Sequence, residues 1–411
     1  MSDAAIPLKN PRLPFVFILI TLTLDAMGIG LILPVMPDLI REIDGGTLGT
    51  AAVWGGVLAT SFAVMQFLFG PILGGLSDRF GRRPVLLVSL LIMAIDYVVM
   101  ALAGSIWLLL AARIVGGITA ATQSTAAAFI ADISPPEKKS ANFGLIGAAF
   151  GVGFVLGPAI GGLLAEFGTR APFYAAAALA FANLLLGFFV LPETVTDKIR
   201  RPFEWRRANP LGALLQISKL KGVSALLLLF FLYEFAFIVY PAIWAFFTQE
   251  RFGWEPSMVG LSLASFGISM VIVQGFLIRI VLPRFGEVKT ILYGFTFNFF
   301  AFIVLTLVDN GWIVLAFTPI TAFGAVVTPA LQGLMSKAAG DDQQGELQGV
   351  IASAKSIAMI FAPLVMTQTF WYFTDDKGLY LPGSAFALSA SLMIVCLAVF
   401  MTWRRMGHSP T

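Results

Sequence analysis

Five ionisable side chains lie inside long apolar segments of the sequence and are the first candidates for chemistry: Asp25, Asp96, Arg113, Glu234 and Lys355. A charged side chain at the centre of a bilayer costs about 2.5–3.5 kcal/mol on insertion scales, so each one needs a partner or a water-filled cavity. A carboxylate in such a place can exchange a proton. We therefore interpret Asp25 as a proton-coupling site, with a purely structural hydrogen-bonding role as the alternative.

Glu234 and Lys355 carry opposite charges in the second half of the chain. We predict that they compensate each other, with Glu234 coupling protons and Lys355 binding substrate; a static ion pair is the alternative. Arg113 and Asp96 are further proton-coupling candidates. Asp96 can pair with Arg113 or take a structural role beside a polar neighbour.

Uncharged polar side chains in the same segments are candidates for binding a substrate: Gln66, Thr119, Gln123, Tyr233, Tyr240, Gln274, Asn298 and Gln332. Most aromatic residues in such segments pack or face lipid, so the two tyrosines alone are a weak signal. The only histidine is His408, near the C-terminal end, and no metal-ligand set or nucleophile–base pair is visible. We therefore expect no metal, no cofactor and no enzymatic activity.

The composition places these residues in a membrane protein. Of 411 residues, 58% are hydrophobic and 12% are charged, whereas soluble proteins average about 25% charged residues. Apolar segments long enough to cross a bilayer predict an all-α protein with twelve transmembrane helices, at 14–36, 51–75, 84–103, 106–132, 141–165, 171–191, 222–247, 257–281, 288–308, 311–337, 346–373 and 381–403. The single cysteine, Cys396, excludes a disulfide within the chain.

The basic residues predict an orientation. Most of the 26 Lys and Arg residues lie between alternate segments, on the side of the N-terminus, which predicts that both termini are cytoplasmic. The polar residues 1–12 lead into the first segment with no small-residue cleavage site after it, so we interpret that segment as a true span.

The two halves of the chain are related. Arg79-Phe80-Gly81 recurs as Arg284-Phe285-Gly286, about 205 positions later, a separation called here the repeat offset. A charged stretch between the halves reads as a cytoplasmic tether and not as a nucleic-acid site. We predict a six-helix bundle over 1–191, a linker over 192–221 and a second six-helix bundle over 222–411. Parallel six-helix repeats are typical of transporters, with the substrate site near the midplane.

A short motif lies between the second and third predicted spans, and its residues are Gly74, Asp78, Arg79, Gly81, Arg82 and Arg83. Its glycines permit tight turning, and its arginines can clamp carboxylates. Simple positive-inside anchoring is the alternative. With the complete spacing Gly-x3-Asp-Arg-x-Gly-Arg-Arg, the motif resembles the first-half signature of the major facilitator superfamily. The resemblance implies that this motif forms a conformational gate with Asp132, a charge cluster that locks the outward-open state.

The fifth predicted span contains Gly153, Gly157, Pro158, Gly161 and Gly162. A small-residue packing face with a proline kink explains part of this pattern. Its order also resembles the antiporter motif of drug/proton exporters in the superfamily.

The tetracycline/proton antiporter group is a closer resemblance, carried by Leu24 to Pro34, Asp96-Tyr97, Arg113 to Thr119, Ile130 to Asp132, Arg251 to Trp254 and Gln344 to Gly349. The resemblance implies that Arg113 lies near the protonatable carboxylates. Two positions depart from the group: Met270 stands where it has a functional histidine, and Asn298 stands where it has an essential aspartate.

Together these features predict a proton-coupled antiporter, a monomer in the bacterial inner membrane, that exports a small amphipathic and tetracycline-like compound by alternating access. The sequence has no Walker loop for direct ATP coupling. A proton-coupled or passive transporter of a metabolite is one alternative. A transporter-like receptor or lipid-handling scaffold without coupled flux is another.

Overall fold

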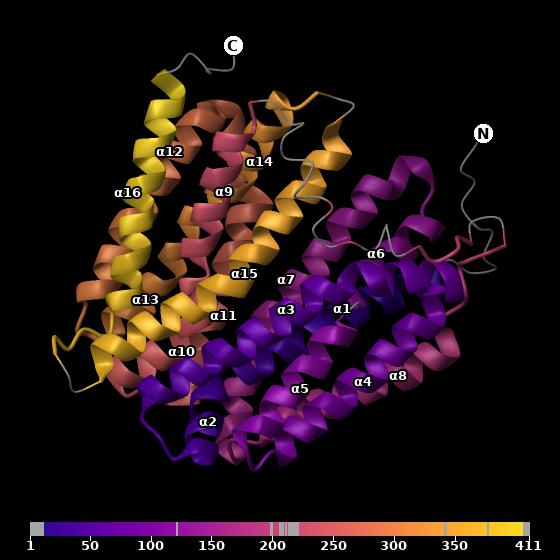
Figure 1. The fold of residues 1–411 in the computed structure, drawn as a ribbon, viewed down its shortest axis with the longest axis horizontal. Helices are drawn as coiled ribbons and strands as arrows, with labels where there is room; N and C mark the ends of the chain where they lie inside the picture. The colour runs from indigo at the N-terminus through magenta and orange to yellow at the C-terminus, as the bar shows by residue number, and fades with distance from the viewer. Residues whose placement is uncertain are drawn as a thin grey trace. The chain divides into compact units, whose positions relative to one another are not determined.

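The computed structural model describes residues 12–120, 122–197, 200–204, 209, 212, 222–340, 343–375 and 378–405. Over these ranges the regular structure is entirely helical (Figure 1). Much of the predicted linker, at 198–199, 205–208, 210–211 and 213–221, and the tail with His408 lie outside the described residues.

The first half of the chain contains the helices α1 to α8. Their bounds are α1 Arg12–Ile32, η1 Leu33–Val35, α2 Met36–Asp44, α3 Leu48–Phe80, α4 Arg82–Leu102, α5 Ile106–Thr119, α6 Thr122–Ile133, η2 Pro136–Lys138, α7 Lys139–Leu164, η3 Ala165–Phe167 and α8 Ala171–Val190. Helix α3 extends beyond its predicted end, so residues 74–80 of the gate motif form its last turns and not a loop. Gly81, with φ 115°, is the turn itself.

The second half contains α9 to α16. Their bounds are α9 Ser224–Phe237, α10 Val239–Phe252, α11 Pro256–Ile272, η5 Val273–Leu277, α12 Ile278–Leu307, α13 Gly311–Thr321, η6 Ala322–Val326, α14 Val327–Ala338, α15 Gln344–Thr374 and α16 Ser384–Arg405. Local signals set several ends: Asn310 accepts a hydrogen bond from the backbone N–H of Trp312 at the start of α13, and Gly253 in the left-handed region ends α10.

In the described residues, 11 stretches are long and apolar enough to cross a membrane. One of them, Pro256–Leu307, has 52 residues and would be about 78 Å long as a single helix, against a bilayer core of about 30 Å. Gly286, at φ 72° and ψ 168°, breaks this stretch between α11 and the membrane-spanning part of α12. It therefore crosses twice, and the twelve-span fold predicted from the sequence is confirmed.

The described helices pack into two compact units. Unit 1 comprises residues 1–44, 61–210 and 256–264, and unit 2 comprises 45–60, 211–255 and 265–411. Helices α3 and α11 therefore each contribute to both units. In unit 1, α4 lies along α8, and α1 packs against α7 and α8 (Figure 1). In unit 2, α16 lies along α12 and α9 (Figure 1).

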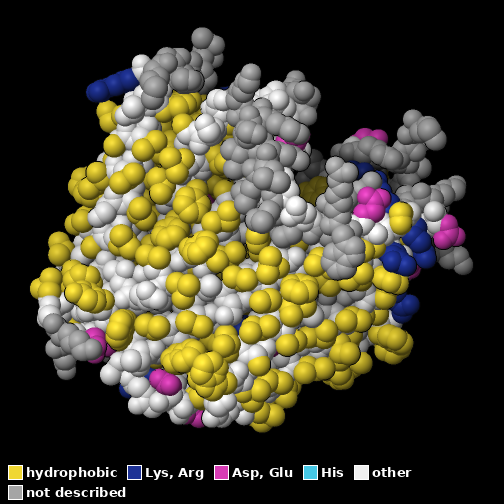
Figure 2. Space-filling model, viewed as in Figure 1, with side chains coloured by type: hydrophobic (Ala, Val, Ile, Leu, Met, Phe, Trp, Pro, Cys, Tyr) yellow, Lys and Arg dark blue, Asp and Glu magenta, His cyan; other side chains and the backbone are white. Residues whose placement is uncertain are grey.

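Apolar side chains lie on the exposed faces of the helices as well as in the contacts between helices. Phe167, Phe189 and Trp312 are more than 70% exposed, which a protein surface in water rarely tolerates at this density. On the face drawn in Figure 2, hydrophobic side chains dominate and charged ones lie toward the periphery. This surface fits lipid as its solvent.

Candidate functional site

Asp96 and Arg113 form a buried ion pair within unit 1. Nη2 of Arg113, on α5, lies 2.7 Å from Oδ2 of Asp96, on α4, and the two side chains are 13% and 5% exposed. Gly116 makes room for the pair, because a Cβ there would lie 3.0 Å from the same carboxylate oxygen. The guanidinium also stands over the ring of Phe62, 5.3 Å from its centroid. Of the two sequence alternatives for Asp96, the structure shows the pairing with Arg113.

Asp25 lies in the middle of α1 and is half-buried. Within the part of the chain that the structure describes, its carboxylate makes no hydrogen bond and no ion pair. Tyr97, packed against Gly28 one turn further along α1, lies within electrostatic reach of both Asp25 and the Asp96–Arg113 pair. A carboxylate with no fixed partner beside a neutralised one is free to take up a proton.

Glu234 and Lys355 lie close together in unit 2. Nζ of Lys355, on α15, is 3.9 Å from Oε2 of Glu234, on α9. The other carboxylate oxygen accepts a hydrogen bond of 2.8 Å from the hydroxyl of Thr328, on α14. Glu234 is 12% exposed and Lys355 is 57% exposed. The ammonium group of Lys355 is thus accessible, while the carboxylate of Glu234 is fixed by Thr328. The contact with Thr328 was not predicted, because a single threonine in the sequence gives no sign of such a role.

Tyr233 and Asn298 meet on the backbone of Gly324. The tyrosine hydroxyl donates to the carbonyl of Gly324 at 3.1 Å, and the Asn298 amide donates to the same carbonyl at 3.1 Å. Both side chains are buried. A Cβ on Gly324 would collide with Asn298. This arrangement joins α9, α12 and η6 through the two predicted substrate-binding residues.

Tyr240 also lies in a packed environment. Its ring contacts Trp244, Phe266, Phe302 and Phe386 at centroid distances of 5.5–6.1 Å. At the two positions where the chain departs from the tetracycline group, Met270 packs against an apolar cluster of unit 2 and Asn298 is fully buried. The remaining uncharged candidates are half-buried at Gln66, Thr119 and Gln332 and exposed at Gln123 and Gln274.

The gate motif forms a charge cluster within unit 1. Arg82 contacts Asp78 at 2.5 Å and Asp132, near the end of α6, at 3.3 Å, and it donates to the hydroxyl of Ser77 at 2.7 Å. Thr194 donates to the same oxygen of Asp132 at 3.0 Å. Arg79 instead stacks on Phe80, 5.1 Å from its ring centroid. Among the described residues no atom lies within 4 Å of a Cβ built on Gly74.

Glu193 completes this cluster and was missed in the sequence. Its carboxylate accepts from the backbone N–H groups of Arg82 and Arg83 at 2.9 and 3.2 Å, and from those of Thr194 and Val195. It therefore caps α4, whose own N-cap residue, Gly81, has no side chain to do so. An acidic residue just after the sixth span, on the same side as the motif, was the available signal.

The glycines of the antiporter motif bring α7 onto α1. A Cβ on Gly153 would meet the carbonyl of Thr23, one on Gly157 that of Met27 and one on Gly161 that of Leu31. These positions are four residues apart and so share one helix face. Gly162 and the carbonyl of Pro158 face the first turns of α11 instead. The motif is a two-sided close-packing surface.

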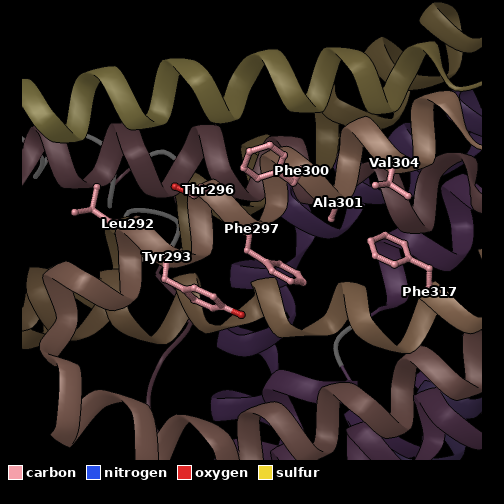
Figure 3. Close-up of a pocket in the computed structure, with 8 residues that line it drawn as sticks. All are labelled: Leu292, Tyr293, Thr296, Phe297, Phe300, Ala301, Val304 and Phe317. Atoms are coloured by element: carbon pink, nitrogen blue, oxygen red, sulfur yellow. The ribbon is translucent and has the colours of Figure 1, made fainter.

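An open groove of about 530 Å³ lies between α12 and α13 (Figure 3). Figure 3 shows the rings of Phe297, Phe300 and Phe317 along it. None of the charged candidate residues lines it. Among the described residues no group of three or more His, Cys, Asp or Glu could hold a metal ion.

Comparison with known proteins identifies the family. The model of the Major Facilitator Superfamily matches residues 18–363. The class C tetracycline resistance protein of Escherichia coli is 42% identical over 382 residues, covering 93% of this chain and 95% of that protein. Multidrug resistance protein 2 of Bacillus subtilis is 28% identical, covering 95% of each.

Solved structures agree. The human organic anion transporter MFSD10 (TETRAN) superposes with a TM-score of 0.68 at 26% identity, covering 96% of this chain and 100% of that one. A bacterial homologue of the lysosomal transporter Spinster gives a TM-score of 0.76 at 17% identity, with 97% and 98% covered. The expected resemblance is confirmed, as is the expectation of a transporter and not an enzyme. The chain belongs to the major facilitator superfamily.

Proposed function

We propose that this protein is a proton-coupled antiporter that exports a small amphipathic compound across the bacterial inner membrane. The observation that carries the proposal is the contrast between the two intramembrane carboxylates of unit 1. Asp96 is neutralised by Arg113 at 2.7 Å, whereas Asp25 has no such partner among the described residues. Asp25 is therefore the group that exchanges the proton, and Asp96 and Arg113 position the helices beside it.

Glu234 and Lys355 are the second element of the proposed site. The accessible ammonium of Lys355 binds a polar group of the substrate, and Glu234, held by Thr328, takes part in proton exchange. Gln66, Thr119, Gln123, Gln274 and Gln332 supply hydrogen bonds to the substrate. Tyr233, Tyr240 and Asn298 act by shaping the walls behind it.

Transport follows from alternating access of two bundles, residues 1–191 and 222–411, joined by 192–221. The cluster of Asp78, Arg82, Asp132 and Glu193 opens and closes in this cycle, which makes it a two-state switch. The protein works as a monomer with both termini in the cytoplasm. One proton moving down 100 mV and one pH unit supplies about 3.7 kcal/mol, enough for an export gradient of several hundredfold.

Tetracycline is the first compound to test, because the chain is 42% identical over 382 residues to the class C tetracycline resistance protein of Escherichia coli. Met270 and Asn298 replace two functional side chains of that group, so the recognition chemistry here differs. An organic anion is the second candidate substrate, favoured by the exposed ammonium of Lys355 and by the similarity to the human organic anion transporter.

Transport into inverted membrane vesicles tests the proposal. An imposed proton gradient should drive tetracycline uptake by the wild type, and Asp25→Asn should abolish it. Asp197→Asn is the matched control, because that carboxylate is 98% exposed and outside the spans. Uptake that persists unchanged in Asp25→Asn, or that ignores the gradient, contradicts proton antiport through Asp25. Lys355→Gln should weaken competition by organic anions more than tetracycline uptake if the second candidate is correct.

A further inference from the structure

An ion pair in unit 2 occupies the same repeat positions as the central ion pair of the gate cluster in unit 1. Arg82 directly follows the positive-φ residue Gly81 and contacts Asp132 near the end of α6. One repeat offset later, Glu287 directly follows Gly286, whose φ is 72°. Oε1 of Glu287 lies 2.5 Å from Nζ of Lys337. Lys337, near the end of α14, is itself one repeat offset from Asp132.

The two pairs have opposite polarity. In unit 1 the cation is on the turn and the anion is on the helix end; in unit 2 the anion is on the turn and the cation is on the helix end. The second-half copy of the sequence motif gives no sign that the two ion pairs are related. Pro283 replaces the motif aspartate, and only Arg284, Phe285 and Gly286 match the first-half copy. The comparison of motifs therefore suggests that the second half has lost this ion pair, whereas the contacts show that an ion pair is retained at the same repeat positions.

The surroundings of Glu287 show that the contact is built into the fold. Its side chain is 21% exposed, whereas that of Lys337 is 59% exposed. It lies over Gly333, one turn before Lys337, where an added Cβ would be 3.7 Å from Glu287 Cγ. The hydrogen bond from Lys337 lowers the pKa of Glu287, so the carboxylate is ionised at neutral pH. Gln344 accepts a hydrogen bond from the hydroxyl of Ser336, the residue before Lys337, and donates one to the carbonyl of Ser336.

We propose that Glu287 and Lys337 are a positioning pair for transport, a charge-reversed counterpart of Arg82 and Asp132 that ties the turn at Gly286 within α12 to the end of α14. The proposal rests on the alternating-access function proposed above. The pair holds the ends of these helices together in one state of the cycle and releases them in the other. What the fold requires is opposite charges at the two repeat positions, in either order.

A reporter cysteine tests the pair without any substrate. Cys396 is the only cysteine and is buried, so Cys396→Ala gives a background in which Gly333→Cys carries the one thiol. That thiol lies beneath the Glu287 side chain, and its rate of labelling by a maleimide in the purified full-length protein reports release of the pair. Lys337→Glu leaves Glu287 in place but repels it, and should raise the rate about three- to fivefold.

The charge-exchanged variant decides the question. Glu287→Lys combined with Lys337→Glu should return labelling to the level of the reporter background, because opposite charges again face each other. Lys289→Gln, which removes a nearby exposed cation with no ion pair in the described region, is the control and should leave the rate unchanged. A double variant that labels as fast as Lys337→Glu alone overturns the proposal, as does a Lys337→Glu variant that labels like the background.

A transport readout keeps the two proposals separate. Vesicle uptake of tetracycline should fall in Lys337→Glu and recover in the double variant. If the wild type transports nothing but labelling follows the charges, the proposed function fails and the pairing stands. If transport is proton-driven but labelling ignores the charges, the function stands and the pairing proposal fails. Elution of each variant as a single species in detergent shows that folding is intact.

Discussion

Nη2 of Arg113 and Oδ2 of Asp96 lie 2.7 Å apart, on neighbouring helices and almost completely withdrawn from solvent. This pair accounts for two of the five intramembrane charges. Asp25, the other intramembrane carboxylate of unit 1, has no hydrogen bond or ion pair among the described residues. Asp96 is thus neutralised by Arg113, whereas Asp25 is available for proton exchange.

Removal of one member of the Arg113–Asp96 pair should lower the free energy of unfolding far more than removal of both. Arg113→Gln leaves the Asp96 charge buried without its partner and should destabilise the protein by about 3–5 kcal/mol. Adding Asp96→Asn should recover a large part of that loss, because no bare charge remains. Thermal unfolding of the single and double variants in detergent measures this. A double variant less stable than Arg113→Gln would contradict the interpretation that Arg113 neutralises the buried charge of Asp96.

Gly161→Ala should destabilise the protein through the contact between α7 and α1. A Cβ at this position would collide with the carbonyl of Leu31, and overpacking of this kind costs about 1–3 kcal/mol. Gly147→Ala, in the same helix but facing open space, is the matched control and should be neutral or slightly stabilising, since alanine favours helix. Equal melting temperatures for the two variants would argue against the packing interpretation of the motif.

Loss of the Glu193 carboxylate should destabilise the start of α4. Glu193→Ala removes the acceptor of the N–H groups of Arg82 and Arg83, a loss of about 0.5–2 kcal/mol for a helix cap. Hydrogen exchange should show faster amide exchange in the first turn of α4 and unchanged exchange in α16. Protection that stays the same at Arg82 and Arg83 would mean that another group caps the helix.

The Glu287–Lys337 pair gives a pH dependence with a defined sign. The hydrogen bond from Lys337 lowers the folded-state pKa of Glu287 below its unfolded value, which is about 4.3 for glutamate. The pair's contribution is therefore complete above the unfolded value and disappears as the pH falls through the folded one. The stability difference between wild type and Glu287→Gln should be at most about 1 kcal/mol at pH 7, and it should shrink below pH 4. A difference that grows on acidification contradicts the pairing.

Much of the fold was predictable because lipid imposes a simple pattern. Apolar length alone predicted the twelve spans. The match of Arg284-Phe285-Gly286 to Arg79-Phe80-Gly81 related the two halves, and the structure adds that both glycines have positive φ. The resemblance to the superfamily signature implied a charge cluster between the motif and Asp132, and the contact of Arg82 with Asp132 agrees with it. Charge balance marked Glu234 and Lys355 as compensating charges, but it did not decide whether the two side chains touch.

The contacts that the sequence left out depend on packing between distant segments. Thr328 carries no local signal, because its role arises only where α14 packs against α9. The position of Glu193 just after the sixth span was a signal, but its cap of α4 forms only where the chain after α8 lies beside the start of α4. The inverted pair of Glu287 and Lys337 was missed for a different reason. A motif search compares residue types, whereas an ion pair is preserved when both charges are exchanged.

Proton release on substrate binding shows whether Asp25 is the coupling carboxylate. Purified protein in weakly buffered detergent should release protons when tetracycline is added, because the substrate and the proton compete for the same state of the site. Asp25→Asn should bind with no proton release, and Asp197→Asn should behave as wild type. Tetracycline binding that releases as many protons from Asp25→Asn as from the wild type would contradict the assignment of Asp25 as the coupling carboxylate.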